Sequence, residues 1–382
     1  MQSGQSQASA DAALHSIIPA GGAGTRLWPL SRQGAPKFLL DLLGQGVSLL
    51  EATILRLAPI SASVTIVTGP AHTEAVEGQI RRLKDAGLLS SALDVSVVTE
   101  PSGRDSMPAI GLATALVAQK YGTDAIVGSF AADHSIGDED AFRSVVLDAV
   151  LAARRGYITT IGIEPTSPST AFGYIQPTDQ PVSPGAQLVS KFVEKPPRSV
   201  AEQYVASGYL WNAGMFVMGA DTVLDHLGRL HPRMATTLET LASLWGGVDA
   251  EVALQIDTLW NNLPRIAIDH ALAEPVAEDG GVAVVAAPPA VAWSDVGDFA
   301  ALADMRRDGA FATGGTGAMH VLIDSDGSFV SGRSDRVIAV VGIERAVVVD
   351  CEDALLVTTR EQAQRVKEVV DALHSRGNER FT

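Results

Sequence analysis

The sequence contains little cysteine and no long uninterrupted apolar run. Cys351 is the only cysteine among 382 residues, which excludes an intramolecular disulfide and a cysteine-based zinc site. We expect Cys351 to be a small apolar side chain beside the apolar run at 347–349. The most apolar segment, 282–293, contains Pro288 and Pro289, and no stretch approaches the ~20 apolar residues of a membrane span. We therefore expect no membrane partner.

Basic residues are also scarce. Lys and Arg number 28 against 44 for Asp and Glu, so the formal net charge is −16. A chain with this balance has no global basic surface to neutralise a nucleic-acid backbone, and generic DNA or RNA binding is excluded. A few cations, backbone amides and a metal ion gathered in one cleft can still bind a small anion.

A secretory signal is absent from the first residues. They contain no cation before Arg26 and no apolar core of the signal-peptide type, so we expect a cytoplasmic protein. Hydrophobic residues make up 46% of the chain, which excludes intrinsic disorder. At about 150 residues per domain, the length indicates two to three domains, or one large α/β domain with an appendage.

The first half of the chain alternates short apolar runs with segments of helical periodicity. The runs predict strands at 14–20, 64–67, 95–98, 125–131 and 158–163, and the periodic segments predict helices at 48–60, 74–86, 107–120 and 140–154. This alternation is typical of a parallel sheet with helices on both faces. Ligands of such sheets bind at the carboxyl ends of the strands.

The second half is less regular. We expect strands at 172–176, 188–193, 214–218 and 282–287, a helix at 199–207 and a helical region over 221–259. The glycine-rich segment 309–317 is predicted to be a linker. Four apolar runs about ten residues apart then predict a small all-β module, with strands at 321–323, 337–341, 347–349 and 355–357 and a terminal helix at 360–373. The predicted domains are 13–305 and 310–382.

A glycine-rich segment follows the first predicted strand. It reads Gly21-Gly22-Ala23-Gly24-Thr25-Arg26, and Lys37 comes shortly after it. Glycines leave backbone N–H groups accessible to phosphate oxygens, and the two cations add positive charge. A dinucleotide fingerprint is excluded because Leu27 stands at its third glycine, and the G-K-[ST] ending of a P-loop is missing.

This segment, continued to Leu30 and followed by Pro36-Lys37, resembles the signature of sugar nucleotidyltransferases, and within them the mannose-1-phosphate guanylyltransferase family. Further segments occur in the family's order: Glu100–Ser106 with Pro108-Ala109-Ile110, Asp133-His134, Phe172-Gly173-Tyr174, Phe192–Pro196, Trp211–Phe216 and Trp293–Gly297. The stretch from Asp335 to Leu356 resembles the family's short β-helical tail. The sequence departs from the pattern at Asp105-Ser106-Met107 and lacks the glutamine that often follows the lysine.

The resemblance implies an α/β fold: a Rossmann-like nucleotidyltransferase domain with a mixed, mostly parallel sheet, plus a small C-terminal β-helix-like module. It also implies a Mg²⁺-dependent enzyme that transfers GMP from GTP to mannose 1-phosphate, giving GDP-mannose and pyrophosphate. The sugar phosphate would attack the α-phosphate of GTP in line.

The resemblance also implies a role for each matching residue. The predicted catalytic residues are Arg26, Lys37 and Lys195. The predicted nucleotide-binding residues are Gly21, Gly22, Gly24, Thr25, Glu100, Gly103, Arg104 and Ser106. The predicted sugar-phosphate-binding residues are Gly173, Glu194, Lys195 and Asn212, and the predicted metal ligands are Asp133 and Asp295.

Several alternatives remain open at this point. The same chemistry can serve another sugar 1-phosphate or another nucleotide, and a catalytically silent homologue can bind a GDP-sugar. Ser106 can be the N-cap of the helix that follows it, and Arg104 a structural ion-pair partner. An added phosphomannose isomerase activity is rejected because the C-terminal module is too short. We also expect a homodimer through the tail, because exposed strand edges favour pairing.

Overall fold

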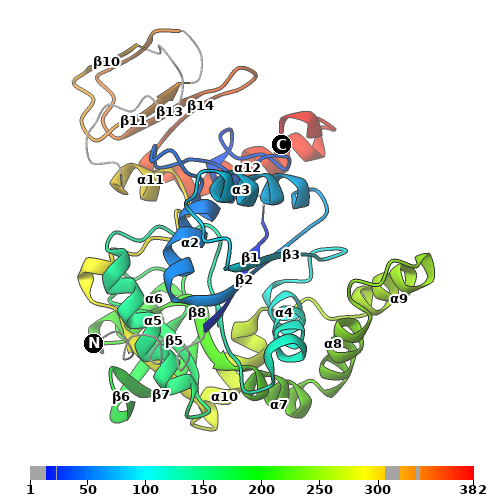
Figure 1. Ribbon diagram of the computed structural model, residues 1–382. Helices are drawn as coiled ribbons and strands as arrows, with labels where there is room; N and C mark the ends of the chain where they lie inside the picture. The colour runs from blue at the N-terminus through cyan, green and yellow to red at the C-terminus, as the bar shows by residue number, and fades with distance from the viewer. Residues whose placement is uncertain (1–13, 23, 306–318, 333–335) are drawn as a thin grey trace, which may run out of the picture. The chain divides into compact units, whose positions relative to one another are not determined.

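The computed structural model describes residues 14–22, 24–305, 319–332 and 336–382 (Figure 1). The chain divides into two compact units. Unit 1 comprises Met1–Gly21, Thr53–Ala132 and Ile136–Trp293, and unit 2 comprises Gly22–Ala52, Asp133–Ser135 and Ser294–Thr382. The predicted linker at 309–317 lies outside the described residues. The domain limits of 13–305 and 310–382 therefore stay a prediction.

Unit 1 is built on a nine-stranded sheet of order β3-β2-β1-β4-β8-β5-β9-β7-β6. β8 and β7 run opposite to the other strands, which confirms the expected mixed sheet. The strands are β1 (Leu14–Ala20), β2 (Ser61–Thr68), β3 (Asp94–Thr99), β4 (Ile126–Ser129), β5 (Ile158–Ile163), β6 (Tyr174–Ser183), β7 (Ala186–Val193), β8 (Leu210–Gly219) and β9 (Val282–Ala286). β8 begins earlier than predicted, so Asn212 lies on a strand.

The carboxyl ends of three neighbouring parallel strands are level. Ala20 at the end of β1 pairs with Thr68 of β2, and Thr68 pairs with Thr99 of β3. The Thr68 hydroxyl also donates to the Ala20 carbonyl at 2.8 Å. Gly21 and Glu100 are the next residues along the chain, so the register brings these two predicted nucleotide-binding positions to one edge of the sheet.

The helices of unit 1 pack on this sheet and on one another. They are α3 (Thr73–Asp85), α4 (Ser106–Tyr121), α5 (Glu139–Ala153), α6 (Arg198–Ala206), α7 (Ala220–Leu230), α8 (Pro232–Leu244), α9 (Ala250–Asn261) and α10 (Glu274–Glu278), and α2 (Leu49–Leu57) spans the boundary between the units. α4 is apolar around most of its circumference because it lies between strands β1 and β2 and helices α7 and α8.

The region predicted to be helical over 221–259 forms three helices. α7 ends before Pro232, which cannot donate a backbone hydrogen bond to a preceding turn. α8 ends at Leu244, ahead of Gly246 and Gly247, and Gly246 has a φ of 85°. The structure also adds a π-helical turn, Asp269–Ala273, where no helix was predicted.

The described residues of the C-terminal part of unit 2 contain five short strands: β10 (His320–Ile323), β11 (Phe329–Gly332), β12 (Ile338–Val341), β13 (Ala346–Asp350) and β14 (Leu355–Thr359). β10 pairs in parallel with β12, and β11 with β13. In both pairs the partners are 18 residues apart in sequence, His320 with Ile338 and Phe329 with Val347. This constant offset means that each coil places a strand beside the equivalent strand of the next coil, which is the geometry of a β-helix.

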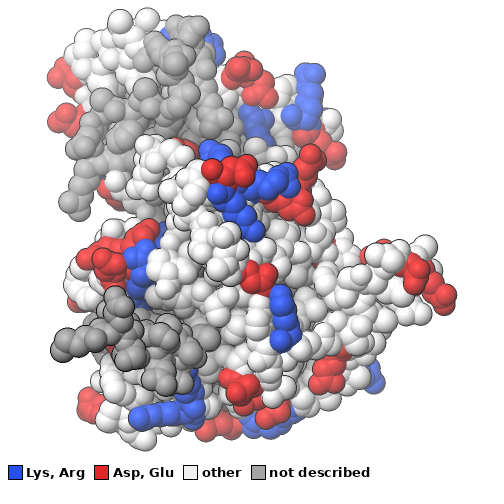
Figure 2. All heavy atoms as spheres, viewed as in Figure 1, with Lys and Arg blue, Asp and Glu red and all other residues white. Residues whose placement is uncertain are grey.

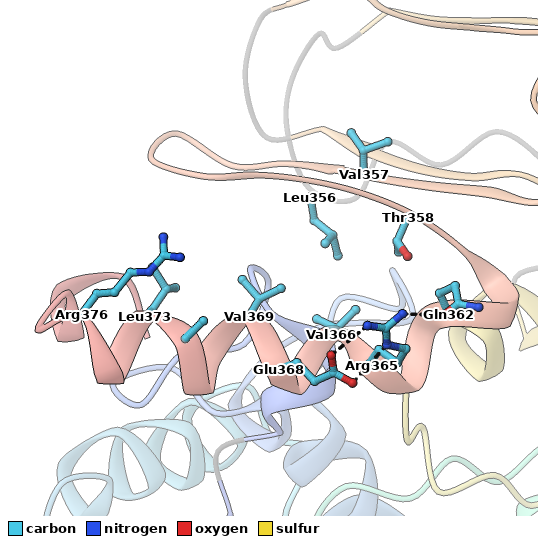
Figure 3. A pocket seen from close by; sticks show the side chains of 11 residues that line it. Leu356, Val357, Thr358, Gln362, Arg365, Val366, Glu368, Val369, Leu373 and Arg376 are labelled. Carbon is cyan, nitrogen blue, oxygen red and sulfur yellow. Dashed lines mark hydrogen bonds and ion pairs between the residues drawn. The ribbon is translucent and has the colours of Figure 1, made fainter.

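Helices α11 (Phe299–Met305) and α12 (Val366–Ser375) complete unit 2, with a 3₁₀ turn at Arg360–Arg365. A pocket of about 490 Å³ lies between β14 and α12, and side chains such as Leu356 and Val369 line it (Figure 3). It contains none of the predicted site residues.

The glycine-rich loop and the C-terminal module share one hydrophobic core in unit 2. Leu27 and Trp28 pack in the same cluster as Val347, Cys351 and Val366. Cys351 is only 7% exposed, as expected for a small apolar core residue. The loop is therefore supported by residues that lie more than 300 positions later in the sequence.

The face of the molecule in Figure 2 carries charges of both signs. On the face in Figure 2, Lys and Arg side chains stand among Asp and Glu side chains and form no continuous basic surface. Among the helices that the structure describes, none has the length and apolar character of a membrane span.

Gly162 of β5 gives a test of the sheet packing. A methyl group there would lie 2.6 Å from Leu210 Cδ1 and 2.8 Å from Val284 Cγ2. We expect Gly162→Ala to lower the free energy of unfolding by about 1–3 kcal/mol, measured by urea denaturation. Gly34→Ala is the control, since nothing lies within 4 Å of its Cβ position. Equal stability of the two variants would contradict the described packing.

Candidate active site

The glycine-rich loop folds closely over the stem of Lys37. Gly24 has a φ of 65°, and a Cβ atom there would lie 3.0 Å from both Cβ and Cγ of Lys37. The Gly24 carbonyl accepts hydrogen bonds from the Leu27 amide at 2.9 Å and the Ser31 hydroxyl at 2.6 Å. Position 24 thus requires glycine both for its backbone conformation and for space.

Lys37 connects the two predicted metal ligands. Its ammonium lies 2.7 Å from Oδ2 of Asp133 and donates to the backbone carbonyl of Asp295 at 2.9 Å. The Lys37 and Asp133 side chains are only 14% and 21% exposed. Three residues predicted from separate motifs therefore meet within unit 2.

The carboxyl group of Asp295 lies in a mixed electrostatic environment. Burial raises its pKa, and the charges of Asp133 and Asp298 add to this effect, while Lys37 and Arg26 oppose it. A divalent cation between Asp133 and Asp295 would relieve the repulsion between these two carboxylates.

The donor set of this site fits magnesium. Mg²⁺ in phosphate-transfer sites is usually held by one or two carboxylates, with waters and phosphate oxygens as its other ligands. Among the residues that the structure describes, no group of three or more His, Cys, Asp or Glu side chains forms a complete metal site. Asp133 and Asp295 thus suit an ion that shares its ligands with a substrate.

Arg26 keeps its charge available. It lies on the 3₁₀ turn Thr25–Leu27, and its Nη1 atom donates to Oε1 of Gln364 at 2.9 Å. Within the described part of the chain, its guanidinium takes part in no ion pair. Unit 2 therefore offers an arginine and a lysine beside two carboxylates, which is a suitable setting for a phosphate chain and a metal ion.

A second group of predicted residues meets in unit 1, around Glu194. Its Oε1 atom accepts from the Lys195 ammonium at 2.6 Å, and its Oε2 atom is buried with no hydrogen-bond partner among the described residues. A Cβ atom at Gly173 would clash with that same Oε2. Lys195 has a φ of 45°, an uncommon conformation for a lysine. The strained turn and the unpartnered oxygen are typical of a ligand-binding site.

Asn212 completes this second group. Its backbone N–H donates to the Gly173 carbonyl at 2.8 Å. Its side-chain oxygen accepts from the Thr160 hydroxyl at 2.8 Å, and its Nδ2 donates to Oδ1 of Asp269 at 2.8 Å. An amide nitrogen carries two hydrogens, so one N–H of Asn212 is left for a ligand.

Sequence reasoning missed Asp269 and Glu274. Asp269 begins the π-helical turn, and burial together with the charge of Glu194 raises its pKa to about 6. Glu274 accepts from the backbone N–H of Glu194 at 3.1 Å and contacts His270 at 2.7 Å. The sequence carries no motif for this turn; only the contacts with Asn212 and Glu194 reveal it.

Glu100 lies directly after β3. It is 8% exposed, its Oε2 has no hydrogen-bond partner among the described residues, and burial raises its pKa to about 7. A carboxyl group in this state can accept from, or donate to, the edge of a nucleotide base. Gly103 follows three residues later with open space at its Cβ position.

Asp105, and not Ser106, is the N-cap of α4, which corrects the expectation for Ser106. Oδ1 of Asp105 accepts from the Ser106 N–H at 2.8 Å. The Ser106 hydroxyl instead accepts from the Ile268 N–H at 2.9 Å. Arg104 donates to Oδ1 of Asn261 at 2.9 Å and to the Leu263 carbonyl at 3.1 Å. Both partners are neutral, and no ion pair of Arg104 is found among the described residues. The nucleotide contacts proposed for Arg104 and Ser106 stay predictions.

Comparison with protein families shows two matches. The model of the nucleotidyl transferase family matches residues 15–310. The model of the mannose-phosphate isomerase/GMP-like β-helix domain matches residues 318–373. Together the two matched ranges span most of the chain.

Individual relatives agree with these families. The xanthan biosynthesis protein XanB of Xanthomonas campestris is 38% identical over 373 residues, 96% of this chain and 74% of the relative. Mannose-1-phosphate guanylyltransferase of Escherichia coli K12 is 35% identical over 379 residues, 96% of this chain and 75% of the relative. A crystal structure titled mannose-1-phosphate geranyltransferase from Thermus thermophilus has a TM-score of 0.78 at 31% identity, covering 94% of this chain and 99% of that one.

The titration of Asp269 gives a test of the unit 1 site. Its pKa is about 6 in the fold against 3.8 for an ordinary aspartate, so between these values the folded state binds more protons than the unfolded state. The free energy of unfolding therefore falls as pH rises through this window. Asn at this position keeps an acceptor for Asn212 but does not ionise. Asp269→Asn should thus be more stable than the parent at about pH 7.5, by at most about 3 kcal/mol.

Urea unfolding at about pH 4 and about pH 7.5 measures this effect, and the difference should disappear at the lower pH. The control is Asp257→Asn, which changes an exposed aspartate on α9. A stability difference for Asp269→Asn that does not change with pH would contradict the raised pKa.

Proposed function

The chain belongs to the nucleotidyl transferase family, and from this membership we propose that it transfers GMP from GTP to mannose 1-phosphate, giving GDP-mannose and pyrophosphate. Relatives named mannose-1-phosphate guanylyltransferase, 34–35% identical over nearly the whole chain, support the choice of substrates. The observation that supports the proposal is the contact of the Lys37 ammonium with the Asp133 carboxylate and the backbone carbonyl of Asp295, together with the electrostatic effect of Lys37 and Arg26 on the Asp295 carboxyl group.

The reaction needs charge neutralisation more than it needs a base. An oxygen of the sugar phosphate forms a bond to the α-phosphorus of GTP, and the bond between that phosphorus and the oxygen bridging to the β-phosphate breaks, so that pyrophosphate leaves. A phosphate monoester with a second pKa near 6 is already mostly dianionic at pH 7. Two unit charges about 4 Å apart repel by roughly 4 kcal/mol at an effective dielectric of 20. Cations must therefore bring the two anions together.

We assign the triphosphate to the residues of the glycine-rich loop. The amides of Gly21, Gly22, Gly24 and Thr25 bind its oxygens, and Arg26 and Lys37 neutralise its charge. The Lys37 ammonium has three hydrogens, of which Asp133 and Asp295 engage two, so one is left for a phosphate oxygen. Asp133 and Asp295 would hold Mg²⁺, which when bound supplies positive charge at the phosphates.

We assign the sugar phosphate and the base to residues of unit 1. Lys195 binds the phosphate of the sugar, and Glu194 and Asn212 bind its hydroxyl groups, supported by the unpartnered Oε2 of Glu194. Gly173 lets the sugar ring approach the backbone. The segment with Glu100, Gly103, Arg104 and Ser106 binds guanine.

A panel of substrates tests this assignment and its nearest alternative. Mannose 1-phosphate is offered with GTP, ATP, UTP or dTTP, and released pyrophosphate is measured with Mg²⁺ and after its removal with EDTA. We expect GTP to be preferred at least about tenfold, and activity to be lost with EDTA and restored with Mg²⁺. Preference for another nucleotide would contradict guanylyl transfer and would favour the same chemistry with a different base. No turnover with any pair would favour a silent binding protein.

Substitutions at the unit 2 site test the residue assignments. We expect Lys37→Ala and Asp295→Ala each to lower the rate of pyrophosphate release by about 100-fold or more while the protein stays folded. Lys84→Ala, at an exposed lysine on α3, is the matched control and should keep the parental rate. Near-normal rates for both site variants would show that the assignment is wrong.

A further inference from the structure

Arg26 is held by a residue from the far end of the chain. Its Nη1 atom donates to Oε1 of Gln364 at 2.9 Å, across a sequence separation of 338 residues. Gln364 lies on the 3₁₀ turn Arg360–Arg365, and both residues belong to unit 2. The C-terminal module therefore reaches directly to a side chain of the phosphate-binding loop.

Gln364 is itself fixed at its other end. Its Nε2 atom donates to Oδ2 of the buried Asp298, whose Oδ1 accepts from the backbone N–H groups of Ala300 at 2.8 Å and Ala301 at 3.0 Å at the start of α11. The amide oxygen faces the guanidinium and the amide nitrogen faces the carboxylate. Only this orientation makes both contacts hydrogen bonds, so the amide has one defined position.

The neutral amide has a consequence for the charge of Arg26. A carboxylate at position 364 would form an ion pair with the guanidinium and reduce its attraction for a phosphate. Glutamine accepts the hydrogen bond and leaves the positive charge intact. Its amide bridges the Arg26 guanidinium and the Asp298 carboxylate.

Further contacts tie the same loop to the C-terminal segment. The indole N–H of Trp28 donates to the Phe381 carbonyl at 2.6 Å, and Arg32 forms an ion pair with Asp353 at 2.8 Å. These contacts anchor the loop, but neither one touches Arg26. Among the described residues, Gln364 makes the contact that orients this guanidinium.

We propose that Gln364 is a positioning residue for the triphosphate: it orients Arg26 toward phosphate oxygens and keeps the guanidinium unneutralised. The C-terminal module thereby contributes to nucleotide binding. This inference rests on the proposed function, because it requires Arg26 to bind a polyphosphate.

The test compares Gln364→Ala and Gln364→Glu with the parent protein. We expect Gln364→Ala to raise the KM for GTP by about five- to tenfold and to leave the KM for mannose 1-phosphate unchanged. Gln364→Glu should raise the KM for GTP further, because its carboxylate pairs with Arg26 and cannot donate to Asp298. The matched control is Gln362→Ala: Gln362 lies on the same turn and, among the described residues, its side chain accepts from Arg365 at 3.2 Å (Figure 3).

A binding cycle separates positioning from a structural role. GTP affinity is measured by calorimetry for the parent protein, Gln364→Ala, Arg26→Ala and the double variant. We expect Gln364→Ala to weaken binding in the parent and to have no further effect once Arg26 is replaced. Additive effects, or parental affinity for both Gln364 variants, would overturn the inference. If the parent neither binds GTP nor transfers GMP, the proposed function itself fails, which is a distinct result.

Discussion

The contact of Lys37 with Asp133 and Asp295 is the interaction on which the candidate site depends. The Asp133 and Asp295 carboxylates repel each other, and the Lys37 ammonium offsets part of this repulsion. The same contact explains Gly24, because the stem of Lys37 occupies the space that a side chain at position 24 would need. Gly24, Lys37 and the two aspartates therefore form one packed group, although they come from three distant parts of the sequence.

The surplus of acidic residues is consistent with an anionic substrate. The net charge is −16, and Asp133, Asp295 and Asp298 act together on one site. Carboxylates close to a phosphate are unfavourable unless a cation lies between them, and hard carboxylate oxygens are the ligands that recruit such a cation. Gln364 avoids a further negative charge near the phosphates, because its neutral amide can hold Arg26 by a hydrogen bond.

Much of the fold could be predicted because its signals are local. Apolar runs located every strand of the main sheet, and the glycine-rich loop and the motifs around Lys195 and Asn212 located most of the candidate site. The failures have a tertiary cause. Asp105 caps α4 while the Ser106 hydroxyl accepts from the distant Ile268, and Asp269 joins the site through Asn212 and Glu194, which are distant in sequence. β11 was missed because the sequence of its four residues, Phe-Val-Ser-Gly, is too short and too polar to stand out.

Lys37 and Lys195 have similar surroundings, each within its own unit. Each ammonium contacts a carboxylate, Asp133 at 2.7 Å and Glu194 at 2.6 Å, and each keeps at least one N–H for another acceptor. A free lysine side chain loses about 2 kcal/mol of rotamer entropy when it is fixed. A lysine already held by a carboxylate has lost much of this freedom before a phosphate arrives, so more of the attraction to the phosphate appears as binding. Pairing therefore has two opposing effects on anion binding at these lysines: the carboxylate lowers the net positive charge, and it holds the ammonium in place.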